Sequence, residues 1–317
     1  MAGTYCYSES KTTDYVFSVG PQFGFIYGKA LEAVYPLPED TKGELLSELR
    51  WDIKPVYYIG IQLDYGLRDL MKESGFFSSL SFKAGIPKNS GIMEDRDWLS
   101  IENNSLTNFS SHTNKTRQFF NVDVSFGASL PVKTYFYFKP LLSGRWMRFA
   151  FSGRDGYGKY ARDKVKNIFG SSGTYFLIED NPDTVSFEGK EVIRYKQDWL
   201  TLSPGISVGT MFINNFTFDL SFLISLFNLC YARDEHVIRD KTFLDIIPGG
   251  FFLEPAFSIT FSVKQMDIYF DVSYRQIGKN KGNTYTKQNN GTYQIALNGA
   301  GSGLFLIDSR FLVKIRF

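Results

Sequence analysis

The chain contains only two histidines, and one of them, His236, follows Asp234 by two residues. Residues i and i+2 of an extended strand point to the same face. The Asp234 carboxylate can therefore lie beside the His236 imidazole and stabilise its protonated form, as in a general base. A solvated Asp and His in a polar loop would give the same local sequence, so this segment alone leaves both interpretations open.

A second acidic stretch, Met93-Glu94-Asp95-Arg96-Asp97-Trp98-Leu99, repeats this spacing. Asp95 and Asp97 would also share one face of an extended chain. The alternative is a solvated loop edge with Arg96 nearby. A carboxylate pair that faces an Asp–His pair could hold and deprotonate a water molecule without a metal or a nucleophilic side chain.

Other chemistries have less support in the sequence. A divalent metal could use one His and several Asp, although a structural zinc site would require more His or Cys. Cys6 and Cys230 lack metal-ligand spacing, and two unpaired thiols are expected. The chain has no GxSxG or P-loop pattern. We therefore predict neither a metal nor a cofactor.

The elements that must position these residues are expected to be β-strands. Aromatic residues make up 17% of the 317 residues, which suits strands and membrane-interface girdles. The mean hydropathy of −0.18 is compatible with a membrane barrel, because lipid-facing and lumen-facing residues alternate. About ten amphipathic segments are predicted as strands: 14–27, 45–65, 75–88, 117–130, 133–152, 191–209, 215–232, 248–263, 267–278 and 303–317.

Short and long connections alternate between these segments. The short ones fall near 130–133, 211–215 and 263–267, and the long polar ones at 28–44, 89–116, 153–190, 233–247 and 279–302. This alternation is typical of an all-β, up-and-down antiparallel transmembrane barrel with long loops at one rim. The terminal segment 311–317 supports it, because apolar residues ending in Phe317 alternate with Lys314 and Arg316.

The remaining features bound the class of protein. The sequence has no run of about 18 apolar residues that would predict a membrane helix. Met1–Thr4 does not begin a signal peptide, so either the protein is not exported or the sequence is a mature form given a new Met. A formal net charge of +2 gives no argument for nucleic acid. We expect one barrel domain, 14–317, after a flexible segment, 1–13. In such a barrel Asp95 and Asp234 emerge at the same rim from roughly opposite walls.

The sequence resembles the omptin family of outer-membrane β-barrel endopeptidases. Seven stretches carry the resemblance, in order: Gly28–Tyr35, Ser47-x-Leu49-x-Trp51, Asp95-Arg96-Asp97-Trp98, Tyr195-Lys196-Gln197, Asp234-Glu235-His236, Lys281–Thr284 and Asn298–Gly301. The resemblance implies that Asp234 orients His236 and that His236 and Asp95 activate the attacking water, with Asp97 completing the site. It also implies that Glu32 receives a basic side chain before the scissile bond.

The chain departs from the family pattern at several positions. Ala232 stands where members often carry an Asp, and Asn108 stands where another loop acid is found. We therefore expect only one carboxylate to hold the substrate cation, and a weaker preference for basic residues than two acids would give. We also expect non-basic residues to be tolerated after the scissile bond. Arg148 matches part of a lipopolysaccharide-binding cluster, but Trp146 and Asp198 replace its Glu and Arg, which argues against dependence on that lipid.

Three functions are compatible with this sequence. The first is a monomeric outer-membrane endopeptidase that acts on peptides or proteins at the cell surface and contacts outer-membrane lipid. The second is a non-catalytic barrel that serves as an adhesin or host-protein binder, for which the long stretch 153–190 is the best argument. The third is a passive porin, which the long loops and facing acids disfavour.

Overall fold

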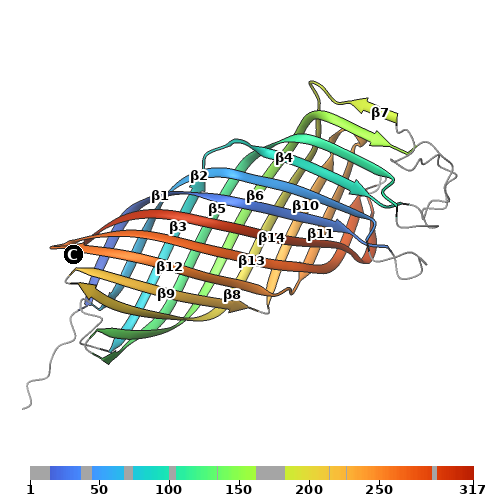
Figure 1. Cartoon of the computed structure of the whole chain (residues 1–317). Coiled ribbons are helices and arrows are strands. Elements are labelled where there is room, and N and C mark those ends of the chain that lie inside the picture. The colour runs from blue at the N-terminus through green and yellow to red at the C-terminus, as the bar shows by residue number, and fades with distance from the viewer. Residues whose placement is uncertain are drawn as a thin grey trace, which may run out of the picture.

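The computed structural model describes residues 15–36, 45–67, 74–99, 105–133, 135–161, 183–213, 215–225, 227–287 and 291–317. Its strands form one antiparallel sheet that closes on itself (Figure 1). They are β1 (Tyr15–Val34), β2 (Ser47–Leu67), β3 (Gly75–Gly85), β4 (Lys88–Asp97), β5 (Asn108–Lys133), β6 (Phe136–Tyr160), β7 (Asp183–Ser186), β8 (Glu191–Ile213), β9 (Phe216–Ser225), β10 (Asn228–His236), β11 (Lys241–Pro248), β12 (Phe252–Val263), β13 (Met266–Lys287) and β14 (Tyr293–Arg316).

The wall of the barrel follows from the pairing of these strands. β4 continues β3, β10 continues β9 and β12 continues β11, each after a short break, while β7 pairs only with β6. The first and last strands close the ring, with Val34 opposite Ala300 and Ser18 opposite Arg316. The expected all-β, up-and-down barrel is confirmed. Among the described residues, no helix has the length and apolar character needed to cross a bilayer.

Side chains alternate between the outer and inner faces of the wall. On β1, Phe17, Phe23 and Phe25 are exposed on the outside, whereas Ser18 and Gln22 between them are buried on the inside. This alternation has a period of two, as expected for a strand with lipid on one side and a polar lumen on the other. The apolar outer band defines the membrane-spanning part of the barrel.

The strands are longer than the sequence predicts. Much of 28–44, 89–116, 233–247 and 279–302, which we expected to be loops, belongs to β1, β4, β5, β10, β11, β13 and β14. These parts lie on the loop side of the apolar band and carry polar outward residues such as Lys29 and Arg233. Backbone hydrogen bonds to neighbouring strands stabilise these extensions, so they need no apolar outer face. The hydropathy pattern of the sequence therefore did not reveal them as strands. Residues 1–13 and 162–182 lie outside the described residues.

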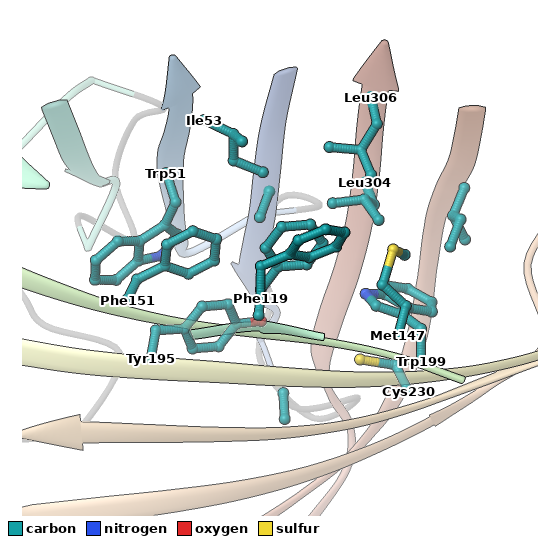
Figure 2. Packing of buried hydrophobic residues seen from close by; sticks show 14 of the residues in the cluster. Trp51, Ile53, Phe119, Met147, Phe151, Tyr195, Trp199, Cys230, Leu304 and Leu306 are labelled. Atoms are coloured by element: carbon teal, nitrogen blue, oxygen red, sulfur yellow. The ribbon is translucent and has the colours of Figure 1, made fainter. Parts of the chain in front are cut away.

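A cluster of buried hydrophobic side chains, rich in aromatic rings, packs inside the barrel (Figure 2). It adjoins the predicted site, because its member Tyr195 lies opposite Asp234 in the β8–β10 ladder. Trp51 of β2 stacks on Phe151 of β6 and Tyr195 of β8, with ring centroids 5.5 and 5.6 Å apart. All three side chains are at most 1% exposed. Offset stacking of large rings adds to the free energy gained by burying them. The packed cluster gives the site a rigid floor and disfavours the passive porin.

Candidate active site

The four predicted catalytic residues lie on two wall strands that face each other across the barrel. Asp95 and Asp97 belong to β4, and Asp234 and His236 belong to β10. β5, β6 and β8 separate these strands on one side of the ring, and five wall strands separate them on the other. The expected opposite walls and common rim are therefore observed. The residues lie in paired strands, however, and not in solvated loops.

Asp234 and His236 form a direct pair. His236 Nε2 lies 2.8 Å from Asp234 Oδ2. Asp234 is only 3% exposed, so the interpretation as a solvated loop does not apply to it. The His236 ring also packs edge-on against Phe243 of β11, with centroids 5.5 Å apart. The hydrogen bond and the ring contact together fix the orientation of the imidazole.

Neighbouring strands fix the carboxylates of Asp95 and Asp97. Ser47 Oγ of β2 donates a hydrogen bond of 3.1 Å to Asp95 Oδ1. Asn108 Nδ2 of β5 donates one of 3.0 Å to Asp97 Oδ2. These contacts follow from the register, in which Asp97 lies opposite Ser47 on one side and Asn108 on the other. Asn108, predicted to contact substrate, is thus buried and bonded to a predicted catalytic carboxylate.

The two pairs influence each other electrostatically. Burial and the nearby Asp97 raise the pKa of Asp95 well above its usual value, while His236 opposes this shift. Burial alone would lower the pKa of His236, but the hydrogen bond and charge of Asp234, together with the charge of Asp95, raise it overall. A protonated His236 is therefore stabilised by carboxylates from both walls. This is the charge arrangement that a general base requires.

The predicted substrate residues Glu32 and Ala232 lie next to this group. Both are 4% exposed. Burial raises the pKa of Glu32 well above its usual value, and the charges of Asp234, Asp245 and Asp95 add to this effect. Gln197 of β8 donates a hydrogen bond to the Leu31 carbonyl at 3.0 Å, which ties β8 to the strand that carries Glu32.

Asp245 of β11 is a buried acid beside the predicted site that the sequence did not single out. It lies directly opposite Ala232 in the β10–β11 ladder and is 5% exposed. Burial raises its pKa to about 7, with Asp234 contributing, although a hydrogen bond from Thr284 opposes the shift. One signal was present in the sequence, because Asp245 shares a strand face with Phe243 and Ile247. An acid in such a position requires a partner or a function.

Arg148, predicted to bind lipid, lies on the outer face of β6. Its Nε and NH2 groups donate to the Asp198 carboxylate at 2.7 and 3.1 Å, and its guanidinium stacks on Trp146. Trp146 Nε1 also donates to Asp198, at 3.2 Å. The Asp198 carboxylate occupies the donors with which Arg148 would bind a phosphate.

Comparison with known proteins identifies the class. The model of the omptin family matches residues 13–307. The chain belongs to the omptin family. A plasminogen activator of Yersinia pestis is 24% identical over 299 residues, which cover 91% of this chain and 85% of that protein. Membership of the family makes this omptin an outer-membrane β-barrel of the protease class, and it confirms the resemblance seen in the sequence.

A solved structure agrees with the fold. The outer membrane protease OmpT from Escherichia coli superimposes on this omptin with a TM-score of 0.82 at 19% identity. The match covers 97% of this chain and 99% of OmpT. At this level of identity the likeness supports the architecture, and the chemistry must be argued from the residues of this chain.

Proposed function

We propose that this omptin is an endopeptidase that hydrolyses peptide bonds at the cell surface with a water molecule activated between Asp234–His236 and Asp95–Asp97. The observation that carries the proposal is the 2.8 Å contact between His236 Nε2 and the buried Asp234 carboxylate, set opposite a second acidic pair. All of these groups come from one chain, so we infer that a monomer suffices for activity.

The hydrogen bond to Asp234 assigns the proton of neutral His236 to Nε2, so Nδ1 is free to act as the base. Nδ1 takes a proton from the water while the Asp95 carboxylate accepts a hydrogen bond from the other O–H. The resulting hydroxide attacks the scissile carbonyl carbon and forms a tetrahedral intermediate. The imidazolium, stabilised by Asp234 and Asp95, then gives its proton to the leaving nitrogen as the C–N bond breaks. The second proton of the water stays on the hydroxyl group of the new carboxylic acid, so both protons are accounted for.

Substrate preference is proposed to follow from the acids beside the water. We infer that Glu32 receives an Arg or Lys side chain before the scissile bond, because a buried carboxylate favours a cationic partner over a neutral one. The side chain of Asn108 is neutral and already bonded to Asp97. Tolerance of non-basic residues after the cut is therefore expected.

The proposal is tested with refolded protein and a mixed peptide library. The substitutions Asp95→Asn, Asp97→Asn, Asp234→Asn and His236→Ala should each lower kcat/KM by about 10² or more, as expected for loss of a general-base step. Activity should survive serine-protease inhibitors and chelators. Loss of activity with a chelator and its recovery on adding a metal would instead support metal chemistry.

A non-catalytic adhesin or host-protein binder remains the second candidate. Its support is the extension formed by β6 and β7, in which all four β7 residues are exposed (Figure 1). The same library distinguishes the two functions. A correctly folded wild-type protein that cuts no peptide would support the binder and would contradict the endopeptidase.

A further inference from the structure

The most deeply buried acidic residues of this barrel, those at most 9% exposed, are almost all paired with a basic side chain. Seven of them have such a partner at 2.5–3.3 Å: Glu48, Asp52, Asp198, Asp234, Glu254, Asp267 and Asp308. Two others, Glu32 and Asp245, have no basic partner within the part of the chain that the structure describes. An unpaired buried carboxylate is costly, so an exception needs an explanation.

The two exceptions lie close to each other. The charge of Asp245 contributes to the raised pKa of Glu32, and both acids act on the pKa of Tyr195. Each also has one buried oxygen without a hydrogen-bond partner, Oε2 of Glu32 and Oδ1 of Asp245. Two carboxyl oxygens that could each accept a hydrogen bond from a cation therefore lie beside the Asp234–His236 pair, one on β1 and one on β11.

We propose that Asp245 is a specificity-determining residue that joins Glu32 in a two-carboxylate site for the cationic side chain of a peptide substrate. This inference rests on the proposed endopeptidase function and differs from the expectation of a single carboxylate, which stays a prediction until the test below. A guanidinium or ammonium group between the two acids would supply the partners that both lack. Arginine suits such a site well, because its planar group can donate to two carboxylates at once.

The strand register explains how Asp245 can take this role. Ala232 and Asp245 are directly opposite each other in the β10–β11 ladder. Side chains that face each other in an antiparallel pair have Cβ atoms roughly 4.5–5.5 Å apart. A carboxylate on either strand would therefore reach nearly the same volume, and the small Ala232 side chain leaves that volume to Asp245. The second acid is present, but it is carried by the neighbouring strand.

The test compares two peptides that differ only at the residue before the cut, which is arginine in one and citrulline in the other. Citrulline has nearly the shape of arginine and no charge, so the ratio of kcat/KM values measures recognition of charge. Asp245→Asn should lower this ratio by about 30-fold or more, because truncating one partner of a buried charge pair has effects of that size. The double substitution Ala232→Asp/Asp245→Ala should restore most of it.

Two controls accompany these variants. Asp240→Asn removes an exposed acid from the preceding turn, where φ is 50°, a conformation that Asn tolerates, and it should leave the ratio unchanged. Glu32→Gln should lower the ratio as Asp245→Asn does. Asp245→Ser serves as a second variant if Asp245→Asn does not fold, as judged by migration of unheated samples on gels.

The outcomes separate this inference from the function on which it rests. A wild-type protein that prefers arginine, loses the preference in Glu32→Gln and keeps it in Asp245→Asn or Asp245→Ser would overturn the role of Asp245 alone. A wild-type protein that cuts neither peptide at any residue would overturn the endopeptidase itself. Cleavage of both peptides at equal rates would overturn the cation site but not the endopeptidase.

Discussion

At the scale of single residues, this omptin concentrates acidic side chains around one histidine. His236 contacts Asp234 and faces the charge of Asp95, and both acids favour its protonated form. In the proposed mechanism His236 must be neutral before it accepts a proton, so these acids would set the lower pH limit of activity as well as the strength of the base. The pH profile therefore reports on the arrangement directly.

We expect kcat/KM to fall as the pH drops through a pKa above about 6.5, the ordinary value of histidine. The sign follows from the charges, because the neighbouring carboxylates stabilise the protonated, inactive form. Asp234→Asn removes the largest stabilising partner, so burial, which lowers the pKa of His236, is then opposed only by the charge of Asp95. In that variant the residual activity should persist to lower pH. The measurement is kcat/KM for one peptide between pH 5 and 9, and an unshifted acid limb in Asp234→Asn would contradict the pairing.

At the scale of elements, β4 owes its position to an irregularity at its start. The β4–β5 register shifts between Asn89 and Ile92, and Gly91 lies at this shift with φ of +106°. A Cβ atom at Gly91 would lie 2.7 Å from the Asp52 Cβ, so a larger residue fits neither the backbone conformation nor the space. The bulge thus directs the segment that carries Asp95 and Asp97.

Gly91→Ala should therefore destabilise the barrel and lower activity together. Forcing a residue with a Cβ into this region costs about 1–3 kcal/mol, and the displaced β4 would misplace the carboxylates. The measurements are the temperature at which the compact form is lost on gels, and kcat/KM for peptide cleavage. Gly144→Ala is the matched control, because a Cβ there meets nothing within 4 Å. Equal behaviour of the two variants would contradict a positioning role for the bulge.

At the scale of the whole molecule, a closed barrel holds a cluster of acids that opposes folding. Glu32, Asp95 and Asp245 all have raised pKa values in the folded protein, mainly because they are buried. The folded state therefore holds protons that the unfolded chain would release. The free energy gained by closing the ring, by packing the aromatic cluster and by placing the apolar outer band in the membrane must offset this cost. Such conflicts between stability and function are common at active sites.

Asp245 gives this conflict a measurable sign. Its pKa is about 7 in the folded protein and about 3.9 when unfolded. Its contribution to stability is thus fully present below about pH 4 and is lost as the pH rises to 7. Asp245→Asn should therefore raise the temperature at which the compact form is lost at pH 8, and the gain should shrink toward pH 4. A gain that is equal at all pH values, or absent at pH 8, would contradict an ionised and unpaired Asp245.

The sequence by itself determined the architecture and the placement, two to a strand face, of the four residues proposed as catalytic. Alternation with a period of two, short turns that alternate with long connections and a terminal Phe predict the barrel, because lipid and lumen impose these patterns locally. The i, i+2 spacing of Asp95 with Asp97 and of Asp234 with His236 also acts locally, and each pair shares one strand face in the structure. A strand places such residues on one face wherever it lies.

Only the tertiary structure decided how far the strands extend and which acids meet. Polar strands above the membrane band lack the apolar alternation that marks a strand in sequence, so they resemble loops until their ladders are seen. Asp245 becomes a neighbour of Ala232 only through the β10–β11 register, and of Glu32 only through closure of the ring. Likewise, Arg148 is hydrogen-bonded to Asp198 because the β6–β8 register places the two residues opposite each other. These are contacts between distant parts of the chain, and local spacing carries no information about them.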